Sequence, residues 1–141
     1  MGVVVRISSR CEYGLRAMVY LAAKVEPDPV TLAEIAAAEG IPQAFLERIL
    51  ARLRDGGLVA TRRGASGGYR LARPAREISV GNVVTAIEGP LSLVGCLSND
   101  QACERSDNCV SKGVWRRLDE AISEALAGIS LEELAPQAIR S

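Results

Sequence analysis

Two helical patterns joined by a three-residue turn constrain the fold of this chain most strongly. Thr31, followed three residues later by Glu34, predicts a capped helix start, and the alanine-rich stretch after it ends at Gly40. Pro42 suits the first turn of a second helix, which we expect over 43–55. Its apolar residues recur at helical spacing: Phe45, Leu46, Ile49, Leu50 and Leu53. Two short helices in this arrangement predict a helix-turn-helix whose second helix reads DNA.

A glycine-rich hairpin is predicted directly after the second helix. Residues 58–62 and 69–71 are typical of strands, and the turn over 63–68 contains three glycines. A phosphate-cradling nucleotide loop is the alternative. That loop carries a Lys-Ser or Lys-Thr pair and is followed by a helix, and this turn has neither feature. A helix-turn-helix followed by a basic hairpin indicates a winged helix.

The charge of the chain is unevenly distributed. The formal net charge is zero, yet the stretch from 48 to 76 contains eight arginines and one acid, Asp55, a balance of +7. The arginines are Arg48, Arg52, Arg54, Arg62, Arg63, Arg70, Arg73 and Arg76. A basic middle in a neutral chain predicts a local surface that faces phosphates, with a solvated face of ordinary helices as the alternative. The expected partner is double-stranded promoter DNA.

Eight residues are the candidates for contact with DNA. They are Gln43, Ala44, Glu47, Arg48 and Arg52 in the second helix, and Arg62, Arg63 and Ser66 in the hairpin. The first four lie early in the helix, where side chains meet base edges. Arg52 is placed either for a phosphate or to support the helix, and the hairpin residues are expected in the minor groove or on its backbone. Glu47 is a candidate selectivity element, because it could accept from cytosine N4 while repelling phosphate.

The remaining patterns predict a mostly helical chain. Helical spacing and capping signals indicate further helices over 9–24, 79–87 and 114–126, and a short one from Ser130 on. We therefore expect a mostly α fold with a small β-hairpin wing. Its parts are a winged helix-turn-helix DNA-binding domain over 1–78 and a region over 79–141 that holds a sensor loop and dimerisation helices. The apolar stripe of the long helix is expected to pair with the same stripe of a second copy.

Three cysteines lie in a polar segment between two apolar patterns. Cys96, Cys103 and Cys109 have six and then five residues between them. A loop rich in Asn, Asp and Ser has no packing reason to hold thiols, whereas thiolates are soft ligands that can converge on zinc or an iron–sulfur cluster. Redox-active thiols, including a disulfide with one spare thiol, and unrelated free cysteines are the alternatives. The chain contains no histidine, which excludes Cys/His zinc sites and histidine catalysts.

The sequence also limits the compartment and the class of activity. No apolar run follows basic residues at the amino terminus, and no segment is long enough to span a bilayer, so the cytoplasm is expected, with no membrane partner. Disulfides are rare in that compartment, which favours metal binding or redox sensing at the cysteines. No acid–base pair, nucleophile dyad or cofactor loop stands out, so an enzyme is not expected.

Several motifs spread over almost the whole chain carry a family resemblance. They are Arg6-Ile7-Ser8-Ser9, Tyr13-Gly14-Leu15-Arg16-Ala17-Met18, Phe45-Leu46-Glu47-Arg48-Ile49-Leu50, Gly56-Gly57-Leu58-Val59, Arg63-Gly64-Ala65-Ser66-Gly67-Gly68-Tyr69-Arg70-Leu71 and the three-cysteine segment before Trp115. Together they resemble the Rrf2 family of bacterial transcription regulators, in the IscR-, NsrR- and RirA-like branch that binds iron–sulfur clusters. The resemblance implies a homodimer with winged-helix heads and a long dimerisation helix. It also implies that Cys96, Cys103 and Cys109 hold a 2Fe–2S or 4Fe–4S cluster.

The resemblance leaves the fourth cluster ligand open. IscR-like proteins carry a histidine three residues after the last cysteine, where this chain has Lys112, and a protonated ammonium has no lone pair for iron. In NsrR-like proteins an acid near the start of the first helix of the other subunit completes the site, and Glu12 holds that position here. Cys11 is a rival ligand. The alternatives are a packing role for Cys11 and a surface role for Glu12, which the helix dipole favours in a first turn.

The expected function is that of a dimeric DNA-binding regulator whose operator binding is controlled by an iron–sulfur cluster. The cluster would respond to redox conditions, nitric oxide or iron–sulfur status. A regulator without a cluster, which uses zinc or thiol oxidation at the same cysteines, is the alternative. A third possibility is an electron-transfer or assembly protein that delivers a cluster, but the arginine-rich hairpin argues against it.

Overall fold

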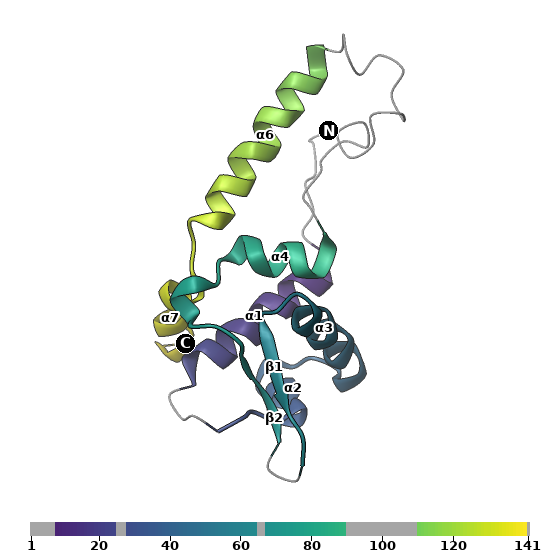
Figure 1. The fold of residues 1–141 in the computed structure, drawn as a ribbon, viewed down its shortest axis with the longest axis vertical. Coiled ribbons are helices and arrows are strands. Elements are labelled where there is room, and N and C mark those ends of the chain that lie inside the picture. The colour runs from purple at the N-terminus through teal and green to yellow at the C-terminus, as the bar shows by residue number, and fades with distance from the viewer. Residues whose placement is uncertain (1–7, 25–27, 65–66, 90–109, 141) are drawn as a thin grey trace.

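The computed structural model describes residues 8–24, 28–64, 67–89 and 110–140 (Figure 1). Its elements in chain order are α1 (Ser9–Ala23), α2 (Leu32–Glu39), α3 (Gln43–Asp55), β1 (Val59–Arg62), β2 (Gly68–Leu71), the 3₁₀ helix η1 (Ala75–Glu77), α4 (Val80–Glu88), α6 (Val110–Ala127) and α7 (Leu131–Arg140). The predicted elements are all present, and the observed long helix begins four residues earlier than the sequence pattern indicated. Among the described residues no helix has both the length and the apolar character needed to cross a membrane.

The α2–turn–α3 unit forms as its capping signals predict. The Thr31 hydroxyl accepts a hydrogen bond from the Glu34 amide at 3.1 Å, and Gly40 ends α2 in the left-handed conformation with φ 64°. The Glu34 carboxylate does not complete the capping box. It accepts instead from the Tyr20 hydroxyl at 2.6 Å and pairs with the Lys24 ammonium at 2.7 Å. This contact ties the start of α2 to the end of α1.

The hairpin is a two-stranded antiparallel sheet attached to the helices by one short bridge. Its register pairs Val59 with Leu71 and Arg62 with Gly68. Val30, which lies before α2, exchanges two backbone hydrogen bonds with Tyr69, at 2.8 and 2.7 Å. A side chain at position 68 would collide with this bridge, because a Cβ there would lie 2.5 Å from the Val30 carbonyl oxygen. The bridge therefore needs glycine at Gly68 and fixes the hairpin against the helical unit.

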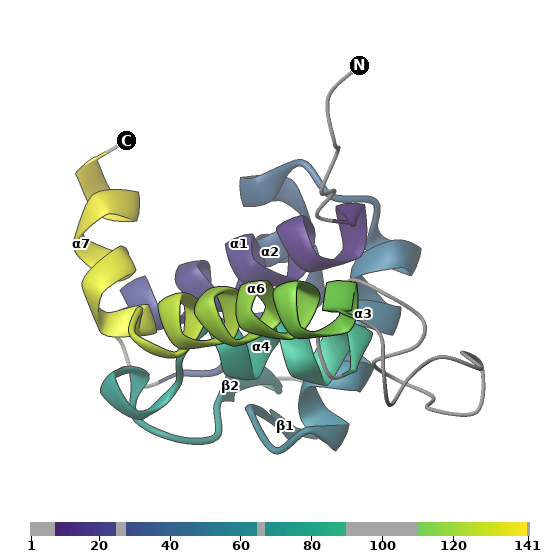
Figure 2. The same cartoon turned by 90° about the horizontal axis from the view of Figure 1, so that it is seen from above.

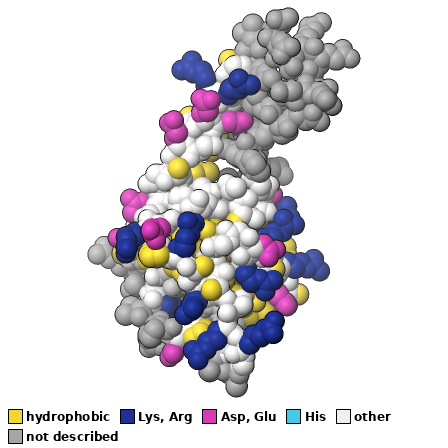
Figure 3. Space-filling model, viewed as in Figure 1, with side chains coloured by type: hydrophobic (Ala, Val, Ile, Leu, Met, Phe, Trp, Pro, Cys, Tyr) yellow, Lys and Arg dark blue, Asp and Glu magenta, His cyan; other side chains and the backbone are white. Residues whose placement is uncertain are grey.

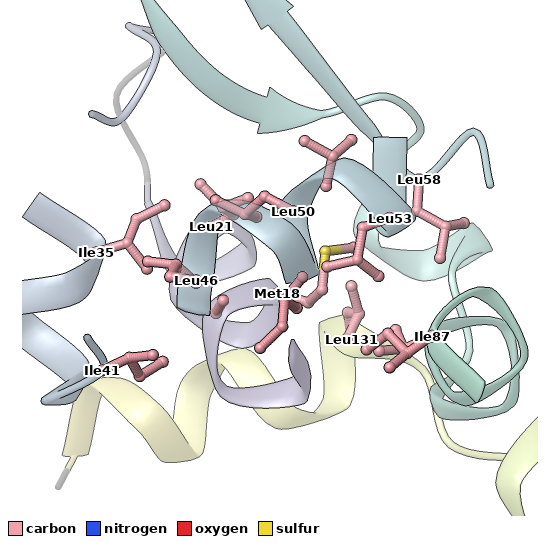
Figure 4. Packing of buried hydrophobic residues seen from close by; sticks show 14 of the residues in the cluster. Met18, Leu21, Ile35, Ile41, Leu46, Leu50, Leu53, Leu58, Ile87 and Leu131 are labelled. Atoms are coloured by element: carbon pink, nitrogen blue, oxygen red, sulfur yellow. The ribbon is translucent and has the colours of Figure 1, made fainter. Parts of the chain in front are cut away.

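One hydrophobic core joins α1, α3, α4 and the start of α7. Figure 4 shows Met18, Leu50, Leu53, Ile87 and Leu131 gathered from these four helices, and each is at most 1% exposed. Full burial of a side chain of this size contributes about 1.5–3 kcal/mol. The domain boundary drawn between 78 and 79 stays a prediction, but α4 and the first residue of α7 pack in the same core as the helices before them. We call this core-sharing part of the chain (α1–α4, the hairpin, η1 and the start of α7) the head.

The long helix α6 extends away from the head (Figure 1), and seen from above it runs over α4 (Figure 2). Its apolar residues Val114 and Leu118 are 56% and 39% exposed. The chain turns back into α7 through the predicted capping box, in which Ser130 N donates to Glu133 Oε2 at 3.0 Å and Glu133 N donates to Ser130 Oγ at 3.3 Å. Among the described residues, the clearest exposed apolar surface thus lies on α6, outside the head.

Candidate nucleic-acid interface

The helix α3 presents the predicted base-reading residues on one exposed face. Its buried residues are Leu46, Ile49, Leu50 and Leu53. The candidates Gln43, Ala44, Glu47 and Arg48 are all exposed. Because the core holds the opposite side of the helix, the exposed face is presented without rearrangement of the head. An exposed helix face of this kind fits the major groove of DNA.

The first helix supports the amino-terminal part of α3. The Tyr13 ring meets the Phe45 ring edge to face, with centroids 5.7 Å apart, and the Arg16 guanidinium lies 5.6 Å from the Tyr13 centroid. Arg16 also donates to the Glu39 carboxylate at 3.3 Å and to the Glu39 backbone carbonyl, at the end of α2. Arg16 therefore holds the turn before α3 and, through Tyr13, the side of α3 itself. The sequence pattern did not assign this role, although both residues belong to one of the family motifs.

Close packing of α1, α3 and α4 around Gly14 sets the distance between α1 and α3. A Cβ on Gly14 would lie 2.2 Å from Ile87 Cδ1 and 3.2 Å from Ile49 Cγ2, so only glycine fits there without a shift. Arg52, expected on a phosphate or as a support, donates from Nη1 to the Ile87 carbonyl at 3.1 Å. A guanidinium suits this position because the last carbonyls of a helix, here α4, are unpaired within it. The supporting role of Arg52 is therefore realised in this structure.

The hairpin adds positive charge beside α3. Arg62 and Arg63 are exposed, at the end of β1 and at the start of the turn. Ser66 lies outside the described residues. Figure 3 shows lysine and arginine side chains gathered over the part of the head that holds α3 and the hairpin. This surface can attract and position a polyanion.

The predicted cluster ligands are only partly placed. Cys96, Cys103, Cys109 and the neighbouring Lys112 side chain are not among the described parts of the chain. Glu12 is exposed in the first turn of α1, and its own chain offers it no side-chain partner among the described residues. A carboxylate there is free to meet a group outside its own head.

The rival ligand Cys11 is 5% exposed and belongs to the core. Burial raises the pKa of the Cys11 thiol above its ordinary value, partly offset by the hydrogen bond with Ser8. The thiolate is the form that binds metal, so both the burial and the raised pKa work against Cys11 as a ligand. The observed position of Cys11 is that of a packing thiol.

The helix α4, the last described element before the cysteine segment, ends beside the first turn of α1. The last residue of α4, Glu88, accepts from the Ser8 hydroxyl at 2.5 Å and from Arg10 Nη2 at 3.1 Å. Ser8 also caps α1, since its hydroxyl accepts from the Cys11 amide at 3.2 Å. The chain enters the segment that holds the three cysteines one residue after Gly89, so this entry is tied to the helix that carries Glu12 and supports α3.

Comparisons with known proteins agree with this architecture. Residues 7–137 match the Rrf2 family, described as "Iron-dependent Transcriptional regulator". The chain is 40% identical over 129 residues to the HTH-type transcriptional regulator IscR of Serratia proteamaculans, covering 92% of this chain and 78% of the relative. It is 39% identical, with the same coverage, to the IscR regulator of Yersinia enterocolitica.

Solved structures show the same fold. The chain resembles CymR, the global cysteine regulator of B. subtilis, with a TM-score of 0.77 and 34% identity, over 95% of this chain and 98% of that one. It resembles T. potens IscR with a TM-score of 0.76 and 35% identity, over 95% and 88%. An oxidized form of Staphylococcus aureus CymR matches with a TM-score of 0.73 and 32% identity, over 93% and 96%. The winged helix, the exposed face of α3 and these similarities lead to one conclusion: this chain is a DNA-binding transcription regulator, not an enzyme, and belongs to the Rrf2 family.

Proposed function

We propose that this protein is a homodimeric regulator whose binding to promoter DNA is controlled by an iron–sulfur cluster. The observation that carries the proposal is the position of α1. This one helix bears the exposed Glu12, is tied through Ser8 to the entry of the cysteine segment, and supports the reading helix through Tyr13 and Phe45. A change in the sensor site can therefore reach α3 through a single rigid element.

The ligand set suits a cluster better than it suits zinc. Four cysteine thiolates are the usual protein ligands of 2Fe–2S and 4Fe–4S clusters, and a non-cysteine ligand can take the place of one of them. The chain has no histidine, and the Cys11 side chain is buried in the core. We propose that Cys96, Cys103 and Cys109 of one subunit and Glu12 of the partner subunit complete the site. When bound, the cluster would supply sensitivity to redox conditions, nitric oxide or iron–sulfur status.

The proposed dimer uses the apolar stripe of α6. Val114 and Leu118 are exposed at helical spacing, and Ile122 and Leu126 continue the stripe, partly buried. A two-fold pair of such helices would cover both stripes at once. It would also set two reading helices about 34 Å apart, the spacing at which dimeric helix-turn-helix proteins read two half-sites.

A ligand from the partner's α1 would join the two halves of this arrangement. With Glu12 of the partner subunit engaged, α1 of one head is held by the cysteine segment of the other subunit. When the cluster leaves and this link breaks, α1 is released, and α3 is free to shift with it because Tyr13 packs on Phe45. Two such states, with different spacing of the reading helices, would give the ligand-dependent switch that an iron-dependent regulator needs.

Anaerobic purification tests the cluster. Protein isolated without oxygen should be brown, absorb in the visible, contain iron and sulfide, and retain promoter DNA differently before and after cluster removal. Cys103→Ser should abolish the colour. Colourless, iron-poor protein that binds its operator as tightly as the native protein would refute the proposal.

The fourth ligand needs a matched control. Glu12→Gln should change the visible spectrum. Glu132→Gln is the matched control, because Glu132 is also an exposed acid in a first helical turn, that of α7, and it should leave the spectrum unchanged. An unchanged spectrum for Glu12→Gln would remove this ligand from the proposal. In that case the fold and the DNA interface would still stand.

A cluster-free regulator is the second candidate. It is favoured by the similarity to a cysteine regulator and to its oxidized form. Such a protein would be colourless. Its DNA affinity would change together with its zinc content, or together with its free-thiol content after oxidant treatment.

A further inference from the structure

A groove lined by three arginines runs along one flank of α3. It has a volume of about 370 Å³ and is lined by Arg10, Phe45, Arg48, Ile49, Ala51 and Arg52. Positions 45, 48 and 52 share one side of a helix, so the groove borders the exposed reading face and includes Arg48 from it. No acidic side chain of the described residues lines it. The groove is therefore a concave, positively charged strip at the edge of the reading helix.

Arg10 reaches this groove from α1 and is held there weakly. Its Nη2 donates to Glu88 Oε2 at 3.1 Å, and the two side chains are 44% and 30% exposed. Pairs that are exposed to this degree contribute little to stability, because water and salt screen them. Arg10 can therefore exchange the Glu88 carboxylate for another anion at small cost.

Arg48 and Arg52 have unused hydrogen-bond donors. Arg48 forms no hydrogen bond or ion pair with the described part of the chain. Arg52 uses Nη1 for the Ile87 carbonyl, one of the five N–H donors that a guanidinium carries. Three guanidinium groups thus line one groove with most of their hydrogen-bonding capacity unused in the described structure.

We propose that Arg10, Arg48 and Arg52 bind one backbone phosphate of DNA beside the reading helix, and that Glu88 competes with this phosphate for Arg10. The inference rests on the proposed DNA-binding function. A helix with its side chains is about 10–12 Å wide and the major groove about 12 Å, so the bordering phosphates lie against the flanks of an inserted helix. Guanidinium groups pair with phosphate through charge-assisted, often bidentate, hydrogen bonds.

The position of Glu88 gives this competition a route to the sensor site. Glu88 is the last residue of α4, and only Gly89 separates it from the segment that holds the three cysteines. Any change at the end of α4 that withdraws the Glu88 carboxylate would leave Arg10 to the phosphate. The DNA contact would then strengthen without any change in the reading face.

The experiment measures the affinity of the full-length protein for promoter DNA at several salt concentrations. Removal of one phosphate contact makes the plot of log K against log salt shallower by about 0.9. Arg10→Gln should weaken binding at low salt and make the slope measurably shallower, by at most about 0.9 for each bound head, because Arg48 and Arg52 still contact the same phosphate. Arg116→Gln is the control, because it removes the same charge from an exposed position on α6, outside the head and outside the arginine-rich stretch 48–76. It should change the slope by much less.

Glu88→Gln distinguishes competition for phosphate from a purely structural role of the Arg10–Glu88 pair. The amide keeps the size of the carboxylate and can still accept from Ser8 and Arg10, but it no longer repels phosphate. Binding should become roughly two- to fivefold tighter at low salt, as expected for the removal of one nearby like charge. If the pair served only to hold α1 on α4, both variants would instead weaken binding.

Two results would overturn the inference: an unchanged salt slope for Arg10→Gln, or weaker binding by Glu88→Gln. The wing variant Arg63→Ala, measured in parallel, distinguishes this failure from failure of the proposed function. If Arg63→Ala weakens binding and flattens the slope while Arg10→Gln does neither, DNA binding stands and the phosphate site does not. If the native protein retains no promoter DNA, both fall.

Discussion

The head and α6 are stabilised in different ways. In the head, helices from both halves of the sequence bury side chains such as Met18 and Leu131 completely. In α6, Val114 and Leu118 remain 56% and 39% exposed. The head thus has its own core, whereas in the described residues the outer part of the α6 stripe, Val114 and Leu118, is left uncovered. The core thus lies in the DNA-reading part, and the exposed residues of α6 fit the dimer contact proposed above.

The largest effect is expected from a cavity in the head. Leu50→Ala should lower the free energy of unfolding by about 2–5 kcal/mol, because the Leu50 side chain is fully buried between α3 and its neighbours. Chemical denaturation monitored by circular dichroism measures the change. A loss below about 1 kcal/mol would mean that the head is not an independently stable unit.

A charged side chain on the α6 stripe should weaken self-association and leave the head intact. Leu118→Glu is expected to weaken self-association roughly tenfold or more, since it replaces buried apolar surface at the proposed two-fold contact. Sedimentation velocity of the cluster-free protein measures the association, and in that form the hydrogen exchange of α1 and α3 should stay unchanged. Arg116→Glu, on the opposite side of α6, is the control. Equal effects of the two variants would argue against the stripe as the interface.

A smaller effect is expected from Arg16, which supports the reading helix without contacting DNA. Arg16→Ala removes a partly exposed ion pair with Glu39 and the cation–π contact with Tyr13, together worth about 1 kcal/mol. Promoter affinity should fall while the salt slope keeps its native value, because every phosphate contact remains in place. A shallower slope would show instead that Arg16 touches the DNA backbone.

The smallest effect is expected from pH. The contacts of Glu34 with Lys24 and Tyr20 lower the pKa of the Glu34 carboxyl below its ordinary value. A lowered pKa in the folded state means that this contribution is present at neutral pH and is lost as the pH falls through the folded-state pKa. Glu34→Gln should therefore reduce stability slightly at pH 7 and make the remaining loss in acid less steep. Thermal unfolding between pH 7 and pH 3 measures both, and a parallel shift at every pH would contradict the assignment.

The sequence by itself determined the local elements of the reading unit. Thr31 and Ser130 predicted helix starts, the glycines predicted the hairpin turn, and the spacing from Phe45 to Leu53 predicted which face of α3 is buried. These signals depend on residues three or four positions apart, so they are visible in a linear pattern. The same locality explains why the periodicity of α3 alone identifies its exposed reading residues.

The tertiary structure alone decided how these elements support one another. Arg52 donates to the carbonyl of Ile87, 35 positions away, and Arg10 meets Glu88, 78 positions away. Arg16 pairs with Glu39, 23 positions away. No local period or capping signal encodes such pairs, because each depends on where the packing of a shared core brings distant backbone segments. Sequence patterns determined what each element is, and the common core determined which side chains meet between them.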